Sequence, residues 1–400
     1  MLQVEEAQAL VMAEVVPGAA EVVPFGESHG RILREDVVAT DDMPASDNSS
    51  MDGYAVRAAD IAGAPVQLPV IGDIAAGHPA SEPLRGRTAM RIMTGAFVPD
   101  GADTVVQVEL TDGRTDRVTI NKALPAGANV RRRGEDMRAG DVVVRAGVRI
   151  GPPEIAMLAA VQKTSVRVGR RPVVAILSTG DELIAIDEPR RAGTIVNTNG
   201  HLLDALVREA GAIPRMLGIV RDTQEATVAA FESALDCDFI LSSGGVSVGA
   251  FDYVKSSLEA LGAESRFWRV AMKPGKPVVL SRLRDRVVLG LPGNPVSCLV
   301  SFHLFVAPAL RKAMGQEHGL LPPIVKARLT APLSSSGERR VYARVHLAAT
   351  DGDLLAHPLT SQGSGSLTSM TGANGLAIIR EGVRGLGTGA VVECALIGAL

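Results

Sequence analysis

The sequence has few aromatic residues, few cysteines and no excess of positive charge. Aromatic residues make up only 3% of its 400 residues, which argues against the stacking platforms that bind nucleic-acid bases. Its 41 lysines and arginines are balanced by 44 acidic residues, which gives a net charge of −3. A chain without a basic excess releases few counterions from a phosphate backbone, so we expect no nucleic-acid partner.

The cysteines also exclude two classes of structure. Cys237, Cys298 and Cys394 lie far apart and show no paired spacing, so neither a disulfide framework nor a zinc cluster is expected. The N-terminus is acidic at Glu5 and Glu6 and lacks the basic flank of a secretory signal. These features predict a reducing, cytoplasmic compartment.

The longest uncharged stretch covers residues 287–310 and is long enough to cross a membrane. Turn residues at 290–295, Gly-Leu-Pro-Gly-Asn-Pro, interrupt it. We therefore predict a buried strand, a tight turn and a buried helix here, and no membrane association.

Changes of pattern along the chain predict several domains. Residues 5–16 and 151–162 have the features of helices, and residues 38–148 carry short β-rich runs, with a hairpin expected at 111–114. The predicted domains are residues 1–37 with 138–170 as a helical connecting domain, 38–137 as a β-rich domain, 171–318 as an α/β domain, and 319–400 as a small C-terminal β-barrel.

Strands and helices alternate between residues 171 and 315, which is typical of a parallel sheet with crossover helices. The predicted strands cover residues 173–177, 215–220 and 239–241, and the predicted helices cover 201–210, 224–235 and 253–261. The fold class is therefore multidomain α/β plus β, with a central parallel-sheet α/β domain between β-rich parts.

Polar segments follow the predicted strands, where ligands bind in open parallel sheets. They are residues 178–182, 221–222, 242–249 with Asp252, 273–277 and 291–297. We expect all five segments to share one rim of the sheet.

The composition of this rim suggests an anionic ligand and a metal ion. The Ser/Gly run at 242–249 can present backbone N–H groups to an anion, and Lys273 and Lys276 add positive charge. The acids in these segments, Asp181, Glu182, Asp222 and Asp252, would repel a bare phosphate. Their presence predicts a bridging Mg²⁺, because Mg²⁺ prefers oxygen ligands.

Each segment alone also has a structural explanation. Ser-Ser-Gly-Gly is as typical of a loop as of a phosphate cradle, and residues 178–182 suit a turn with a helix cap. Residues 47–54, 91–95 and 131–136 suit surface loops. The occurrence of the rim segments together is what favours a functional site.

Seven segments in this order resemble the molybdopterin molybdenumtransferase family, which includes the C-terminal domain of gephyrin. They are residues 50–55, 92–96, 133–136, 178–183, 243–249, 272–277 and 291–297. The resemblance implies a molybdopterin-binding α/β domain, elongated β-rich N-terminal domains and a C-terminal β-barrel. It also implies an enzyme of molybdenum cofactor biosynthesis that inserts molybdate into adenylylated molybdopterin and releases AMP, with Mg²⁺ as cofactor.

The resemblance also implies roles for individual residues. The implied catalytic residues are Asp52, Thr94, Asp136, Glu182, Asp222 and Asp252, of which Glu182, Asp222 and Asp252 would also hold Mg²⁺. The expected substrate-binding residues are Ser178, Thr179, Gly180, Ser243, Gly244, Gly245, Ser247, Arg269, Lys273, Lys276, Pro292 and Pro295. Molybdate would be bound by Arg344 and Ser364. Arg269 departs from the family pattern, which has lysine at that position.

The expected partners are adenylylated molybdopterin, molybdate, a second copy of the chain in a homodimer, and transiently a molybdopterin adenylyltransferase that supplies the substrate. In the homodimer, Asp52 and Thr94 of one chain would act on the site of the other. Two alternatives remain open, a molybdopterin adenylyltransferase and a non-catalytic scaffold like the gephyrin domain. Release of AMP that depends on molybdate distinguishes the transferase from both.

Overall fold

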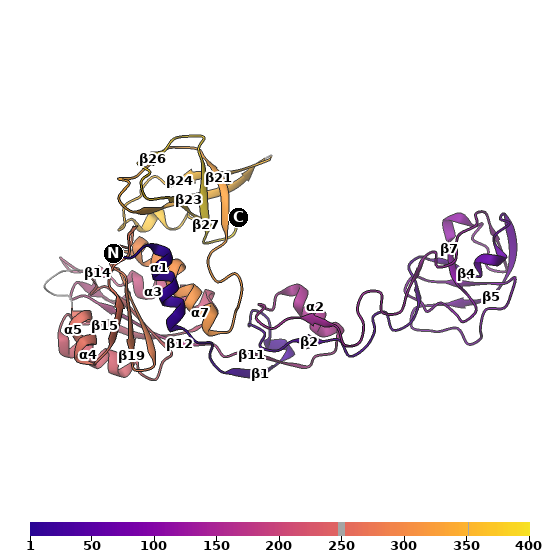
Figure 1. The fold of residues 1–400 in the computed structure, drawn as a ribbon, viewed down its shortest axis with the longest axis horizontal. Helices are drawn as coiled ribbons and strands as arrows, with labels where there is room; N and C mark the ends of the chain where they lie inside the picture. Colours follow the sequence, from indigo (N-terminus) through magenta and orange to yellow (C-terminus); the bar gives the residue numbers. More distant parts are fainter. Residues whose placement is uncertain (247–252, 351) are drawn as a thin grey trace. The chain divides into compact units, whose positions relative to one another are not determined.

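A computed structural model describes residues 1–246, 253–350 and 352–400 (Figure 1). The chain forms two compact units. The first unit contains residues Met1–Glu35, Ala146–Pro152 and Ser165–Leu400, and the second contains Asp36–Arg145 and Pro153–Thr164. The division into four domains at the boundaries given above stays a prediction.

The second unit is built around a five-stranded mixed sheet. Its strands, in the sheet order β7-β4-β6-β5-β8, are β7 (Thr104–Gln107), β4 (Gly53–Val56), β6 (Ala89–Ile92), β5 (Val66–Ile74) and β8 (Arg117–Ile120). Smaller elements are the pair β2 (Val37–Val38) and β10 (Val142–Val144), the pair β3 (Asn48–Ser49) and β9 (Val130–Arg131), the short helices η2 (Ala58–Asp60) and η3 (Val108–Leu110), and helix α2 (Pro152–Ala160). Side chains alternate along β4, so Tyr54 and Ala55 belong to hydrophobic clusters on opposite faces of the sheet.

The hairpin expected at residues 111–114 is present as a short antiparallel reversal of the chain. Thr111 forms an isolated antiparallel bridge with Ile120, and the backbone N–H of Asp112 donates to the carbonyl of Thr119, at 3.2 Å. Residues 111 and 112 therefore lie in one arm of the reversal and not at its tip. The longer strand pairings are those of β7 with β4 and of β8 with β5.

The first unit contains a six-stranded sheet whose order is β15-β12-β16-β20-β19-β17. The bounds are β15 (Ile213–Val220), β12 (Val173–Thr179), β16 (Phe239–Ser243), β20 (Arg286–Leu291), β19 (Val279–Leu283) and β17 (Glu264–Phe267). The first four strands are parallel, as predicted, whereas β19 and β17 are each antiparallel to their neighbour. The predicted helices are confirmed as α3 (Thr198–Glu209), α4 (Gln224–Ser233) and α5 (Tyr253–Ala260).

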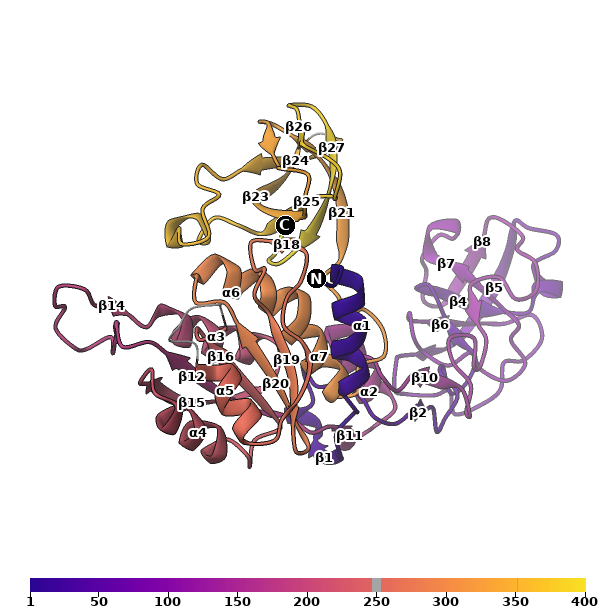
Figure 2. The same ribbon diagram turned by 60° about the vertical axis from the view of Figure 1, so that its left-hand side comes forward.

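Helices cover both faces of this sheet, as Figure 2 shows. Val174 and Ile176 of β12 pack with α1 (Val4–Glu14), α3 and the long helix that follows β20. Ala175 and Leu177, which point the opposite way, pack with α4 and α5. This is the alternation expected of a strand that is buried on both faces.

The long helix that follows β20 has three parts, α6 (Pro295–Ser301), the π-helical segment η4 (Phe302–Val306) and α7 (Ala307–Ala313). Pro308 has no N–H to offer to the carbonyl of Leu304, and the side chain of Gln8 in α1 donates to that carbonyl instead, at 3.2 Å. Residues Pro295–Ala313 are long and apolar enough to cross a membrane, but 83% of the most apolar window is buried inside the protein. The predicted strand, turn and buried helix are thus confirmed.

The C-terminal part is a closed five-stranded barrel, as predicted. Its strands are β21 (Ile324–Leu329), β23 (Arg340–Thr350), β24 (Asp353–Pro358), β25 (Gly375–Ile379) and β27 (Val391–Leu396), and the barrel closes because β23 pairs with both β24 and β25. The short strand β18 (Met272–Lys273) leaves the α/β domain and pairs with the start of β23. This pairing brings the segment that contains Lys273 against the barrel.

The remaining elements connect these layers. They are β1 (Ala20–Pro24) paired with β11 (Ser165–Gly169), β13 (Leu183–Ile184) paired with β14 (Ile195–Val196), β22 (Leu333–Ser334) paired with β26 (Gly385–Leu386), and the short helices η1 (Phe25–Glu27) and η5 (Leu367–Ser369). All three cysteines are buried and free of disulfides, as expected.

Candidate functional site

The polar rim predicted from the sequence is present in the first unit. Residues 178–182, 221–222, 242–245 and 291–297 begin at or follow the carboxyl ends of the four parallel strands. Residues 273–277 reach the same rim from the other direction, because they precede the antiparallel strand β19. Val279, the first residue of β19, pairs with Gly290 near the end of β20.

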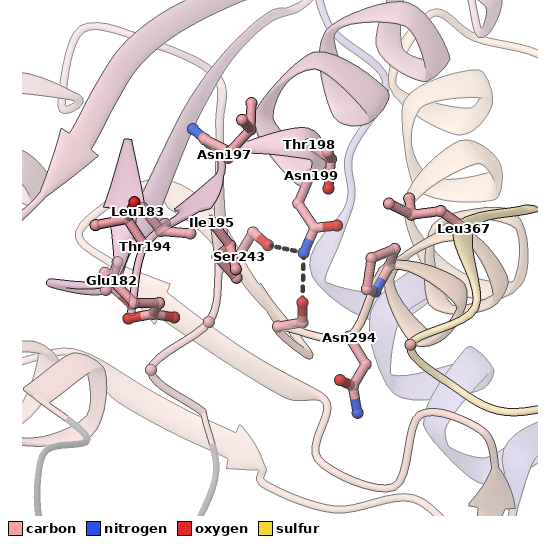
Figure 3. Close-up of a pocket in the computed structure, with 18 of the residues that line it drawn as sticks. Glu182, Leu183, Thr194, Ile195, Asn197, Thr198, Asn199, Ser243, Asn294 and Leu367 are labelled. Carbon is pink, nitrogen blue, oxygen red and sulfur yellow. Dashed lines mark hydrogen bonds between the residues drawn. The ribbon is translucent and has the colours of Figure 1, made fainter. Parts of the chain in front are cut away.

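A cavity of about 640 Å³ opens on this rim and is shown in Figure 3. Eight of the predicted site residues line it, namely Thr179, Gly180, Glu182, Asp222, Ser243, Gly244, Gly245 and Pro295. Gly365 and Leu367, from the barrel part of the unit, complete its wall. We call it the rim cavity.

Glycine is required in the loop after β16. Gly244 and Gly245 have φ angles of +88° and +65°, in the left-handed region that side chains disfavour. A Cβ atom on Gly244 would lie 2.8 Å from the backbone oxygen of Thr179, and one on Gly245 would lie 2.6 Å from the side chain of Val254. The loop thus packs its backbone tightly against β12 and the side chain of Val254, and both glycines line the rim cavity.

Carboxylates gather at one side of the rim cavity. The backbone N–H of Asp222 donates to the carboxylate of Asp181, at 3.2 Å. Burial raises the pKa of Asp222, and the negative charges of Asp181 and Glu182 act in the same direction. A carboxylate with a raised pKa beside two other acids is stabilised by a nearby cation.

The described residues do not form a complete metal site. No group of three or more His, Cys, Asp or Glu side chains close enough to hold a metal ion occurs among them. Asp252, the third predicted Mg²⁺ ligand, and Ser247 lie outside the described residues. Glu182 and Asp222 are thus two of the three predicted ligands, and both line the rim cavity.

A second cavity, of about 660 Å³, lies between the rim and the barrel, and we call it the barrel cavity. Lys273, Lys276, Pro292 and Ser364 of the predicted set line it, together with Arg339. The structure therefore does not bring the two lysines together with the carboxylates of the rim cavity, because the pairing of β18 with β23 carries the lysine segment toward the barrel.

One side chain lies on the wall between the two cavities. Asn294 lines both of them, and its amide donates to the hydroxyl of Ser364, at 3.0 Å. The backbone N–H of Val296 donates to the carbonyl of Ser364, at 3.1 Å. The turn after β20 thus holds Ser364 of the barrel at the edge of the α/β domain.

Arg344, predicted to bind molybdate, is completely buried and lines neither cavity. Its guanidinium donates to the hydroxyl of Ser369 at 2.9 Å and to the carbonyl of Ser361 at 2.7 Å. Burial lowers the pKa of Arg344. In this structure the side chain therefore organises residues 361–369, the loop that carries Ser364.

Two further predicted residues, Ser178 and Arg269, lie apart from both cavities. Ser178 is buried in β12 next to the rim. Arg269 lines an open cavity of about 600 Å³ with Lys276 and Trp268, and the ammonium of Lys255 lies 5.6 Å from the centre of the Trp268 ring. Lys276 thus belongs to a basic surface that extends outward from the barrel cavity.

The remaining predicted residues belong to the second unit. The backbone N–H and the hydroxyl of Thr94 both donate to one oxygen of Asp52, at 2.7 and 2.8 Å, and these hydrogen bonds lower the pKa of Asp52. Asp136 lines a separate cavity of about 460 Å³ with Asn48 and Arg131. Asp52 and Thr94 thus form one exposed pair, and Asp136 lies at another place in the unit.

The sequence analysis missed several residues of the rim cavity. Asn197, Thr198 and Asn199 begin helix α3, and Arg190 and Thr194 come from the loop between β13 and β14. Asn197 caps the helix, since its side chain accepts from the backbone N–H of Gly200. An asparagine at a helix start is explained by capping, so the sequence held no separate signal for a binding role.

The fold and its rim define a multidomain ligand-binding protein with an α/β centre and a barrel that completes the site. Family models match nearly the whole chain. Residues 2–161 match the MoeA N-terminal region (domain I and II), residues 175–312 a probable molybdopterin binding domain, and residues 326–397 the MoeA C-terminal region (domain IV).

Curated relatives and solved structures agree with these matches. The molybdopterin molybdenumtransferases of Nostoc sp. and Bacillus subtilis are 41% and 38% identical, over 90% and 99% of this chain and 85% and 94% of their own lengths. Two crystal structures of a molybdopterin biosynthesis MoeA protein from Pyrococcus horikoshii match with TM-scores of 0.81 and 0.86, at 34% and 30% identity, over 100% and 99% of this chain and all of theirs. The chain therefore belongs to the molybdopterin molybdenumtransferase family, a family of enzymes of molybdenum cofactor biosynthesis, as its motifs predict.

Proposed function

We propose that the chain inserts molybdate into adenylylated molybdopterin and releases AMP, with Mg²⁺ as cofactor. The observation that supports this most directly is the pair of cavities that share Asn294. One is suited to a nucleotide with a metal ion and the other to a small oxyanion, and the two substrates of this reaction are of these two kinds.

The rim cavity suits the pterin nucleotide in size and chemistry. Its volume of about 640 Å³ lies in the range of small-molecule sites. Leu183, Ile195 and Leu367 supply apolar surface for a flat ring. Gly244 and Gly245 line the same cavity, so a phosphate of the substrate would lie beside the loop that follows β16.

Glu182 and Asp222 would hold the Mg²⁺ ion. The raised pKa of Asp222 fits this role, since a cation relieves the repulsion among Asp181, Glu182 and Asp222. Two carboxylates are also what Mg²⁺ needs when substrate phosphates and water complete its octahedral shell. When bound, the ion would neutralise charge on the phosphates of the substrate.

The barrel cavity would take molybdate as a substrate. Lys273 and Lys276 supply the charge that a dianion requires, and the hydroxyl of Ser364 supplies a donor. Arg344 contributes indirectly in this arrangement, by fixing the loop that carries Ser364. This differs from the sequence analysis, which places the lysines on the same rim as the carboxylates.

The chain's own groups then supply binding and orientation for the transfer. Asn294 fixes the position of Ser364 beside the rim cavity, so that the oxyanion is held next to the nucleotide. Cleavage of a phosphoanhydride needs charge neutralisation more than a covalent nucleophile, which agrees with a site built from carboxylates, lysines and backbone groups. Holding the two substrates next to each other would supply the rest of the rate enhancement.

Assembly and location also stay proposals. We propose a homodimer in which Asp52, Thr94 and Asp136 contribute to catalysis, a transient contact with a molybdopterin adenylyltransferase, and a cytoplasmic location. The match of family models to residues 2–161 and 326–397 favours a full-length transferase over an adenylyltransferase that contains the α/β part alone.

The test is incubation of the purified chain with adenylylated molybdopterin and Mg²⁺, with and without molybdate. We expect AMP to be released only when molybdate is present. AMP release at the same rate with and without molybdate contradicts the proposal. Binding of adenylylated molybdopterin without any turnover favours the scaffold alternative.

A further inference from the structure

The side chain of Asn199 is held rigidly at the floor of the rim cavity. Its amide nitrogen donates to the hydroxyl of Ser243, at 2.8 Å, and to the backbone carbonyl of Gly293, at 2.7 Å (Figure 3). It therefore ties helix α3 to the end of β16 and to the turn after β20. The residue is buried, since it exposes only 8% of its surface.

The hydrogen bond to Gly293 fixes which way the amide faces. A backbone carbonyl can only accept, so the NH₂ group of Asn199 must point toward Gly293 and its oxygen must point away. Both N–H groups of the amide are used by Ser243 and Gly293. The carbonyl oxygen is thus committed as an acceptor.

That oxygen has no hydrogen-bond partner within the described part of the chain, although it is buried. A buried acceptor without a partner is costly, and nearly all such groups in folded proteins are satisfied by protein, water or ligand. Asn199 lines the rim cavity, where Leu183, Ile195 and Leu367 provide apolar walls. A flat heterocycle between such walls would present its edge to the amide.

We infer that the side-chain oxygen of Asn199 accepts a hydrogen bond from the exocyclic amino group of the substrate's heterocycle. The inference rests on the proposed function, which supplies two rings with such a group, the pterin and the adenine. Both share the chemistry of an aromatic amine beside ring nitrogens. A ring that carries an oxo group at that position would place one acceptor against another and be rejected.

The experiment compares two pairs of ligands that differ at this group. Pterin is compared with lumazine, in which oxo replaces the 2-amino group, and AMP is compared with IMP, in which oxo replaces the 6-amino group. Dissociation constants are measured by calorimetry for the wild type and for Asn199→Ala. In the wild type we expect at least about tenfold preference for the amino member of one pair.

Asn199→Ala should reduce that preference to about twofold or less, and the pair that responds identifies the ring. His201→Ala is the control on the same helix, because His201 is exposed on α3 and does not line the rim cavity. Both preference ratios should be unchanged in that variant.

Two results would overturn the inference. The first is a wild type that binds the members of each pair equally while it releases AMP in a molybdate-dependent manner, which leaves the proposed function standing. The second is a preference that survives in Asn199→Ala. Thermal denaturation and circular dichroism establish that each variant is folded.

Discussion

The two cavities of the first unit share a wall but carry opposite charge. The rim cavity holds the carboxylates of Glu182 and Asp222, and Arg190 is the cation among its described lining residues. The barrel cavity holds Lys273, Lys276 and Arg339, and no acid occurs among the described residues that line it. Under the proposed function, this contrast would separate two anionic substrates that are bound side by side. The nucleotide would be bound with Mg²⁺ beside the carboxylates, and molybdate would be neutralised by the lysines.

The largest effect on activity is expected when a carboxylate of the rim cavity is removed. Asp222→Ala should leave the fold intact and reduce AMP release at least about a hundredfold, because the proposed Mg²⁺ site loses one of its two described carboxylates. Initial rates at saturating substrate measure this. Asp236→Ala, which removes an exposed carboxylate paired with Arg215, is the control and should be fully active. Normal turnover by Asp222→Ala would remove the carboxylates from the mechanism.

A mixing experiment tests whether the acids of the second unit belong to the same reaction. Asp52 and Asp222 lie in different units of the chain. If the active protein is a homodimer with composite sites, inactive Asp52→Ala and inactive Asp222→Ala chains should together recover about a quarter to a half of wild-type activity. Subunit exchange is followed with two affinity tags. Complete exchange without recovery would show that each site is built from one chain.

Removing a lysine of the barrel cavity should weaken the binding of molybdate alone. Lys273→Ala should raise the KM for molybdate about tenfold to a hundredfold, since a charge-assisted hydrogen bond is lost, and should leave nucleotide binding nearly unchanged. Lys326→Ala, on strand β21 outside both cavities, is the control. Equal losses for both substrates would mean that the lysine serves the nucleotide after all.

Substitution of Arg344 tests whether this side chain contacts molybdate directly or acts by holding the loop that carries Ser364. Ser364→Ala should raise the KM for molybdate without changing the melting temperature. Arg344→Ala should raise the KM and also lower the melting temperature, because its hydrogen bonds to Ser361 and Ser369 are lost in a buried place. An Arg344→Ala protein of unchanged stability with weakened molybdate binding would favour the direct contact implied by the family resemblance.

The sequence predicted the α/β layer well because its strands and helices alternate with clear periodicity. Each of the strands β12, β15 and β16 and the helices α3, α4 and α5 overlaps its predicted range. The antiparallel strands β17 and β19 were missed, since they are short and carry no crossover helix. The expected hairpin at 111–114 is present, but Thr111 and Asp112 lie in one of its arms, and β8 pairs over its whole length with β5.

The rim could be predicted, but its division into two cavities could not. That division depends on β18 pairing with β23, a contact between segments almost seventy residues apart in the sequence. Arg344 was expected to bind molybdate because of the family resemblance, but it is fully buried and its guanidinium donates to Ser369 and to the carbonyl of Ser361. Asn199 was missed because capping explains asparagines at helix starts, and the free oxygen becomes visible only with the hydrogen bonds of the structure.

A smaller effect is expected from the one described cation of the rim cavity. Arg190 lies on the loop between β13 and β14, which projects from the α/β domain in Figure 2. Arg190→Ala should raise the KM for adenylylated molybdopterin about threefold to tenfold, as suits an exposed charge facing a phosphate. Arg191→Ala is a closely matched control, since Arg191 is the next residue and does not line the cavity. Equal effects of the two substitutions would indicate general electrostatic attraction by the loop.

The smallest effect concerns stability and pH. The folded-state pKa of Asp222 is raised, chiefly by burial and further by the charges of Asp181 and Glu182. For a carboxyl group with a raised pKa, the folded state binds the proton more tightly than the unfolded state does. Stability is therefore lost as pH rises from the unfolded to the folded pKa, and it stays reduced at neutral pH.

Asp222→Asn removes this loss, so without Mg²⁺ its melting temperature at pH 7 should exceed that of the wild type. The difference should vanish in acid, at pH values below both pKa values. Mg²⁺ should then raise the melting temperature of the wild type more than that of Asp222→Asn. Equal responses of the two proteins to Mg²⁺ would contradict the assignment of Asp222 as a ligand of the ion.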